Sequence, residues 1–187
     1  MIKFSCEKVF LQNAIAVTSR AVAQKSSIPA LEGLLIHADQ QLTISGYNMQ
    51  TGIRTNVFAN VVEGGDIVLN ARLFGDIIRR MPDDMITFTA DEKMMVHVSC
   101  GDADFDILGL SAADYPELPE VEDEYAVSMK QSVLRRMIEE VAFAVSTNES
   151  RPVHTGALFE IENMCLNMVA VDGFRLAFRR EKLEKLE

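Results

Sequence analysis

The sequence predicts an α+β fold that contains two copies of one unit, the second copy incomplete. Strand-like and helix-like segments follow one another as strand, helix, several strands, helix and several strands. The opening order then restarts after an acidic stretch, and Ser27 and Pro29 recur at one constant offset as Ser150 and Pro152. Recurrence of the same unit at a fixed spacing is typical of an internal repeat.

The first predicted domain spans residues 1–115. Its first helix, 7–23, follows from helical spacing of apolar side chains, and Pro29 lies in the corner that ends this region. Its second helix, 72–80, begins after Asn70, a residue type that caps helices well. We expect the buried face of the first helix to carry Val9, Phe10, Ala14, Val17 and Ala21. The expected strands are 2–6, 31–38, 42–45, 52–59, 67–69, 85–90, 94–99 and 105–110.

Residues 116–124 predict an acidic inter-domain linker, because two prolines interrupt regular structure and the apolar side chains are scattered. The second predicted domain, 125–187, begins with a strand at 125–129 and a helix at 131–146. Strands at 156–161 and 165–171 follow, and residues 181–187 form a charged tail.

A hairpin is predicted at Asp172-Gly173, which separates two apolar runs. Glycine tolerates the positive φ that such a turn requires, so this dipeptide is a strong hairpin signal. The hairpin is the last intact piece of the repeat. Whether the chain is a fragment or borrows strands from a partner, the edge of its unfinished sheet is expected to be an association site.

Composition limits the class of protein. Forty-eight per cent hydrophobic residues can supply packed cores, and no apolar run reaches the roughly eighteen residues of a membrane span. Residues 1–6 lack the long apolar segment of a signal peptide, so we expect a cytoplasmic protein with no membrane contact. The net charge of −10 argues against a surface coated in phosphate-binding charge, although it permits a local basic face.

The positive charge gathers on or beside the predicted helices. Two interpretations remain open at this stage: a phosphate-facing surface for nucleic acid, or ordinary solvated helix faces. The residues concerned are Arg20, Lys25, Arg72, Arg79, Arg80, Lys130, Arg135 and Arg136.

Catalytic patterns are weak. No zinc-protease, hydrolase, Walker or dinucleotide motif occurs, and His37 and His97 fall inside strand patterns as ordinary sheet residues. Asp172 and Arg175 are spaced as a turn-stabilising pair rather than a catalytic one. Three scattered cysteines, Cys6 among them, are expected to be buried apolar side chains. We therefore predict no catalytic residue, no metal and no cofactor; an enzyme that uses the hairpin cleft is the weakest alternative.

Four stretches carry a family likeness: 28–31 (Ile-Pro-Ala-Leu), 70–74 (Asn-Ala-Arg-Leu-Phe), 112–116 (Ala-Ala-Asp-Tyr-Pro) and 171–176 (Val-Asp-Gly-Phe-Arg-Leu). In this order they resemble the N-terminal half of a bacterial sliding clamp, the beta subunit of the replicative DNA polymerase III. The resemblance implies a DNA-clamp fold with antiparallel sheets outside and helices inside.

The resemblance also implies a function that is not enzymatic. Two chains form a ring that slides on duplex DNA as a processivity factor and tethers the polymerase, the clamp loader and repair proteins through short peptides. The alternative is a truncated clamp-like protein that binds such peptides, or a full clamp, without encircling DNA.

Site residues carried over from the family fall into three groups. Lys25 and Asn148 match DNA-contacting positions, and Ile77 and Phe105 match the ring interface. Some family members place basic residues beside that phenylalanine, whereas this chain has Asp102, Asp104 and Asp106. Phe174 and Val171 stand where histidine and threonine are common, which makes the pocket more apolar. The implied peptide pocket contains His154, Val171, Gly173, Phe174, Arg175 and Leu176.

Overall fold

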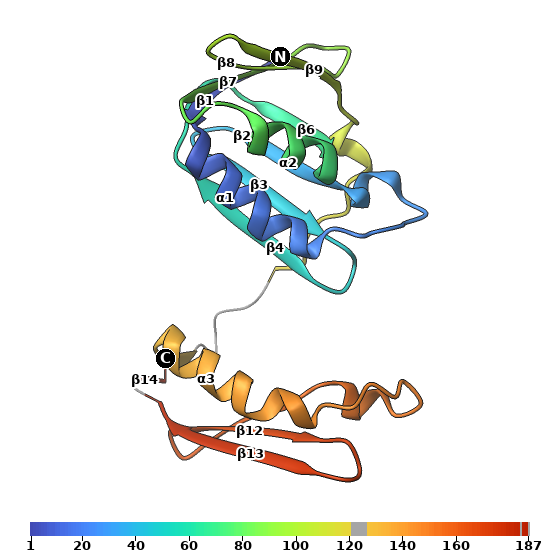
Figure 1. Cartoon of the computed structure of the whole chain (residues 1–187), viewed down its shortest axis with the longest axis vertical. Helices are drawn as coiled ribbons and strands as arrows, with labels where there is room; N and C mark the ends of the chain where they lie inside the picture. The colour runs from blue at the N-terminus through green and yellow to red at the C-terminus, as the bar shows by residue number, and fades with distance from the viewer. Residues whose placement is uncertain (121–126, 184, 187) are drawn as a thin grey trace. The chain divides into compact units, whose positions relative to one another are not determined.

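The computed structural model describes residues 1–120, 127–183 and 185–186. It divides into two compact units, Met1–Pro119 and Glu120–Glu187 (Figure 1). The first unit extends past the expected end at residue 115, and Leu118 packs against the buried cluster that contains Tyr47 and Tyr115. Residues 121–124 of the expected linker, and 125–126 of the strand expected after it, lie outside the described residues.

The first unit contains two antiparallel sheets. One has five strands in the order β5-β1-β7-β8-β9, and the other has four in the order β4-β3-β2-β6. The five-stranded sheet consists of β1 (Ile2–Glu7), β5 (Asn60–Glu63), β7 (Met85–Ala90), β8 (Met95–Cys100) and β9 (Ala103–Leu108). The four-stranded sheet consists of β2 (Gly33–Ala38), β3 (Leu42–Tyr47), β4 (Gly52–Val57) and β6 (Gly65–Asn70). Strand β5 is not among the predicted elements.

Two helices lie side by side in this unit (Figure 1). Helix α1 (Lys8–Thr18) packs on β3 and β4, and α2 (Ala71–Arg80) packs on β2 and β6. The predicted cap of α2 is confirmed, because the Asn70 side chain accepts a hydrogen bond of 3.0 Å from the Leu73 amide. Short 3-10 turns complete the unit: η1 (Ser19–Ala21), η2 (Pro29–Glu32) and η3 (Ala112–Asp114).

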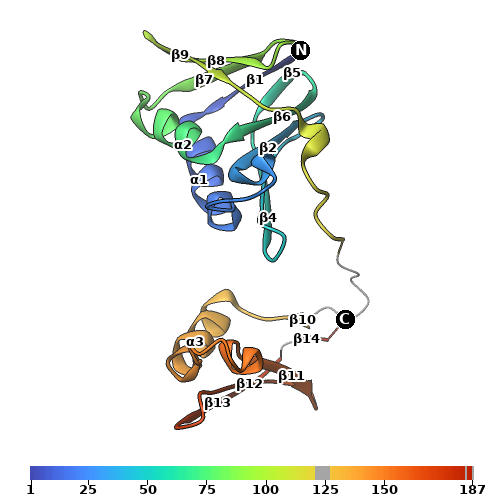
Figure 2. The ribbon, with the colours of Figure 1, turned by 90° about the vertical axis from the view of Figure 1, so that its right-hand side faces the viewer.

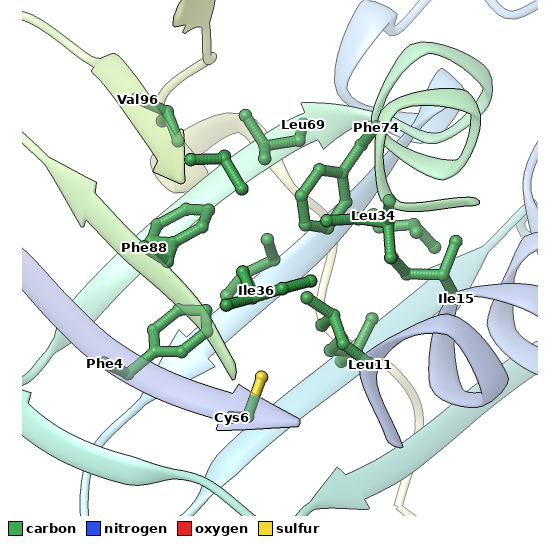
Figure 3. Packing of buried hydrophobic residues seen from close by; sticks show 14 of the residues in the cluster. Phe4, Cys6, Leu11, Ile15, Leu34, Ile36, Leu69, Phe74, Phe88 and Val96 are labelled. Carbon is green, nitrogen blue, oxygen red and sulfur yellow. The ribbon is translucent and has the colours of Figure 1, made fainter. Parts of the chain in front are cut away.

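The core of the first unit lies between the sheets and the helices (Figure 3). Phe4 stacks on Phe88 with ring centroids 4.5 Å apart, and Phe74 of α2 meets Phe88 edge-on. Cys6 and Cys100 are buried free thiols, as expected, whereas Cys165 in the second unit is only half-buried. Burial raises the pKa of Cys6 to about 12. These aromatic contacts join α2 to the five-stranded sheet.

The predicted buried face of α1 is largely wrong. Val9, Phe10 and Val17 are exposed, whereas Leu11 and Ile15 are almost completely buried. The helix is apolar on more than one side, so helical spacing alone permits several faces. Contact with β3, β4 and α2 selects the face that is buried.

The second unit repeats part of the first. Its sheet has the order β11-β12-β13, and α3 packs on β12 and β13 (Figure 2). The predicted charged tail is partly wrong, because β13 continues to Lys182 and β14 pairs with β10. The helix also ends earlier than expected, at Val141. The elements are β10 (Val127–Ser128), α3 (Gln131–Val141), η5 (Ala142–Ala144), η6 (Pro152–Thr155), β11 (Leu158–Glu162), β12 (Cys165–Val171), β13 (Leu176–Lys182) and β14 (Lys185–Leu186).

Candidate functional site

The β12–β13 turn is held by Asp172. One carboxylate oxygen, Oδ1, accepts hydrogen bonds from the amides of Phe174 (2.9 Å) and Arg175 (3.0 Å). The other, Oδ2, accepts one from the Arg175 Nε at 2.8 Å. The Phe174 amide, aided by the hydrogen bonds and charge of Arg175, holds the pKa of Asp172 below its usual range. Asp172 and Arg175 are therefore a turn-stabilising pair, with Gly173 at a φ of 92° completing the turn.

A hollow of about 600 Å³ lies against this turn. Of the predicted pocket residues, His154, Gly173, Phe174 and Arg175 line it. Phe174 is 99% exposed, so its ring is available to cover an apolar ligand group. The guanidinium of Arg175 also lies over the Phe143 ring, 5.7 Å from its centroid.

The other predicted pocket residues, Val171 and Leu176, pair across the hairpin and do not line the hollow. They alternate with Ala170 and Ala177, which belong to the core under α3. Because neighbouring strand residues point to opposite faces, Val171 and Leu176 lie on the sheet face away from α3. Leu176 is exposed there and Val171 is half-buried.

The opposite wall of the hollow is a loop that the predicted pocket did not include. Its backbone is fixed locally: the Ser146 amide donates to the His154 carbonyl at 2.9 Å, and the Ser150 amide donates to Asn148 Oδ1 at 3.0 Å. A polar loop between a helix and a proline corner is a general signal for function. The lining residues of the loop are Val145, Ser146, Thr147, Asn148, Ser150 and Arg151. Asn148, predicted to contact DNA, thus shares the hollow with the predicted peptide residues.

The predicted basic residues divide into two groups. Arg20, Lys25, Arg72 and Arg80 are exposed, and within the described part of the chain none of them forms an ion pair. The others are exposed as well, but most have neutralising partners. Arg79 pairs with Asp76 (2.6 Å), Arg135 with Glu139 (2.9 Å) and Arg136 with Glu181 (2.9 Å).

A hollow of about 270 Å³ lies between helices α1 and α2, and another of about 620 Å³ lies between the start of α2 and residues 19–32. Arg72 and Ser19 line both, and Arg79 lines the smaller one. Unpaired cationic side chains beside a groove between two helices can contact phosphates, because such contacts depend on positive charge and require little shape complementarity.

The two predicted interface residues have different environments. Ile77 belongs to the core of the first unit and is only 8% exposed, and its assignment to the ring interface stays a prediction. Its side chain points inward because α2 packs on β2 and β6. Phe105 is 42% exposed on β9, an edge strand, and the neighbouring Leu108, not among the predicted residues, is 68% exposed.

Other polar groups form structural pairs. His37 in β2 lies 2.5 Å from Asp66 in β6, and His97 in β8 lies 2.8 Å from Asp106 in β9. Both histidines are strand residues, as predicted. Within the described ranges no cluster of three or more potential metal ligands occurs. No helix in the same ranges is long and apolar enough to cross a membrane.

Comparison with known families gives two adjoining matches. Residues 2–119 match the family described as "DNA polymerase III beta subunit, N-terminal domain", and residues 128–187 match "DNA polymerase III beta subunit, central domain". Among curated proteins, the beta sliding clamp of Halalkalibacterium halodurans is 35% identical over 95% of this chain and 49% of its own length. That of Lactococcus lactis is 34% identical over 100% of this chain and 52% of its own.

Solved structures agree. A putative DNA polymerase III beta subunit from Eubacterium rectale superposes with a TM-score of 0.94 at 31% identity, over 100% of this chain and 51% of that one. The polymerase sliding clamp of Bacillus subtilis gives 0.93 at 30%, over 98% of this chain and 51% of that one. The tandem units therefore define a protein with the DNA-clamp fold.

The chain belongs to the DNA polymerase III beta subunit family. It spans about half the length of the curated relatives it matches and corresponds to their N-terminal part. Its second unit therefore corresponds to an incomplete clamp domain.

Proposed function

We propose that this chain is the N-terminal portion of a sliding clamp, the processivity factor of bacterial DNA replication. Its matches to solved clamps over nearly its whole length are the observation that carries the proposal. The complete clamp would close as a two-chain ring on duplex DNA in the cytoplasm and would catalyse no reaction. A ring holds DNA by topology, so weak phosphate contacts are sufficient and strong ones would oppose sliding.

The DNA-facing charge is assigned chiefly to Arg20, Lys25, Arg72 and Arg80. They are exposed and have no carboxylate partner within the described residues, so their charge is available to phosphates. The second unit adds Lys130 and Asn148, both exposed. Arg79, Arg135 and Arg136 contribute less, because each shares its charge with a neighbouring carboxylate.

The hollow beside the hairpin is proposed as the docking site for short peptides of the polymerase, the clamp loader and repair proteins. The exposed Phe174 ring offers an apolar anchor, and His154, Arg151 and Asn148 offer polar contacts around it. Val171 and Leu176 extend the apolar surface on the adjoining sheet face. A sliding clamp from Bartonella birtlesii solved bound to griselimycin supports ligand binding within the family.

The β9 edge is proposed as a ring contact in the complete dimer, with Phe105 as its apolar element. Asp102, Asp104 and Asp106 make this edge acidic, so a matching surface would carry basic side chains.

Retention on DNA tests the proposal. The complete clamp that contains this portion, loaded on a nicked circular duplex, is expected to remain bound through gel filtration and to be lost after the circle is linearised. Equal retention on both substrates would contradict encirclement. Peptide binding without retention would favour the alternative, a clamp-like protein that binds peptides without enclosing DNA.

A further inference from the structure

Phe143 carries an exposed aromatic ring beside the hairpin hollow. It lies in η5, two residues before the polar loop that forms one wall of this hollow. The residue is 58% exposed, and it belongs neither to the core that the described residues of the second unit form nor to the lining of the hollow. Its ring is therefore free to make a contact outside the core.

The partner of this ring is the guanidinium of Arg175. Its Cζ lies over the Phe143 ring, 5.7 Å from the centroid, within the distance at which the face of an aromatic ring attracts a cation. The same guanidinium donates through Nε to Asp172 Oδ2 at 2.8 Å. Asp172 in turn accepts hydrogen bonds from the amides of Phe174 and Arg175. One guanidinium thus connects the hairpin turn to the segment that leads into the opposite wall.

This contact joins the two walls of the hollow, which otherwise are held separately. The hydrogen bonds of the loop are local: the Asn148 amide donates to Ser146 Oγ at 3.0 Å, and the Ser146 amide donates to the His154 carbonyl at 2.9 Å. Among the described residues, no hydrogen bond or ion pair runs from residues 145–151 to the turn at 172–175. The spacing of the two walls therefore depends on the contact between Phe143 and Arg175.

The first unit has no matching contact. The alignment of the two repeats places Arg20 at the Phe143 position and Thr51 at the Arg175 position, and this pair offers no aromatic ring. The turn of the first unit is fixed in another way, because Tyr47 is buried in a cluster with residues from the end of that unit. The connection through a guanidinium and a ring thus occurs in the unit whose turn remains accessible.

We propose that Phe143 is a positioning residue of the peptide site: its ring holds Arg175, and Arg175 holds the turn that presents Phe174 at a fixed spacing from the loop. The inference rests on the proposed function of the hollow as a peptide site and adds a residue that does not touch the peptide. A preformed hollow spares the peptide the cost of ordering the turn. Without the contact, only the molecules with correctly spaced walls bind, so the apparent dissociation constant rises by the inverse of their fraction.

The test measures the affinity of the complete clamp that contains this portion for a fluorescently labelled, polymerase-derived clamp-binding peptide. Phe143→Leu keeps an apolar side chain and removes the ring, so binding should weaken about two- to fivefold, the full worth of an exposed cation–π contact. Phe143→Tyr keeps the aromatic face and should restore the affinity. Amide exchange at residues 173–175 should be faster in the leucine variant than in the tyrosine variant.

A double-mutant cycle separates positioning through Arg175 from any other role of the ring. Arg175→Gln removes the cation, so the addition of Phe143→Leu to this variant should cause no further loss of affinity. Three results would each overturn the proposal: unchanged affinity in the leucine variant, an equal loss in the tyrosine variant, or a full further loss in the Arg175→Gln background.

Failure of this proposal can be told apart from failure of the proposed peptide site. If the unmodified clamp does not bind the peptide, the peptide site and this inference are both wrong. If it binds the peptide with an affinity that depends on Phe174 but not on Phe143, the peptide site stands and only this inference is wrong.

Discussion

Strand β2 in the first unit and strand β11 in the second occupy matching places in the repeat but have different surroundings. Strand β2 lies between β3 and β6, and most of its residues are buried, whereas β11 is an exposed edge. Both segments follow a proline corner and precede a hairpin. The difference shows that strand burial here depends on the neighbouring strand rather than on local pattern.

The two matching hairpin turns also differ in their surroundings. Asn48 Oδ1 accepts from the amides of Gln50 and Thr51, as Asp172 Oδ1 accepts from those of Phe174 and Arg175. Beside the first turn, Tyr47 is buried in a cluster with Tyr115 and Leu118 from the end of the unit. Beside the second, the corresponding Val171 is only half-buried and a hollow remains. The repeated turn is therefore covered in one unit and accessible in the other.

The substitution with the largest expected effect on stability lies in the core of the first unit. Phe88→Ala removes a completely buried ring that contacts Phe4 and Phe74, and should lower the free energy of unfolding by about 3–5 kcal/mol. Amide exchange during denaturation should show destabilisation of residues 1–119 with little change in 158–182. Equal destabilisation of both regions would show that the units unfold together.

Peptide affinity should depend on the exposed turn of the second unit. Phe174→Ala should weaken binding of a polymerase-derived clamp-binding peptide by roughly 1–3 kcal/mol, measured by calorimetry. Phe58→Ala, which removes a ring that is 83% exposed in the first unit, is the control and should change nothing. An unchanged peptide affinity in the Phe174 variant would show that the hairpin is not part of the peptide-binding site.

The two turns should respond differently to pH. The folded pKa of Asp172 is lowered, so its stabilisation is complete above the unfolded pKa and is lost as pH falls through the folded value. Amide exchange at residues 173–175 should therefore rise in acid relative to that at 49–51, where neutral Asn48 holds the turn. Asp172→Asn should abolish the difference. Persistence of the acid response in that variant would assign it to another group.

The smallest expected effect is on the salt dependence of DNA binding. Lys25→Ala should reduce the slope of log affinity against log salt by about 0.9, because one phosphate contact is lost. Arg79→Ala is the matched control and should change the slope less, since Asp76 already partners this arginine. Equal slopes for the Lys25 variant and the unmodified chain would undo the assignment of Lys25 to DNA.

Local features of the fold could be predicted from the sequence alone. Asparagine before an amphipathic segment predicted the cap of α2, and Asp172-Gly173 predicted the hairpin, because both depend on hydrogen bonds within a few residues. The repeat and the family likeness likewise followed from the order of residues. These features also located four of the residues that line the hollow.

Which apolar side chains are buried depends on tertiary packing. Helix α1 offers several apolar faces, and packing selected Leu11 and Ile15 instead of Val9, Phe10 and Val17. Packing of α2 on its sheet likewise turned Ile77 inward. The loop that forms the second wall of the hollow is distant from the hairpin turn in sequence, since its last lining residue, Arg151, lies 21 positions before Asp172. Burial of a side chain and assembly of the hollow both depend on contacts between segments that are distant in sequence. No local sequence pattern specifies such contacts.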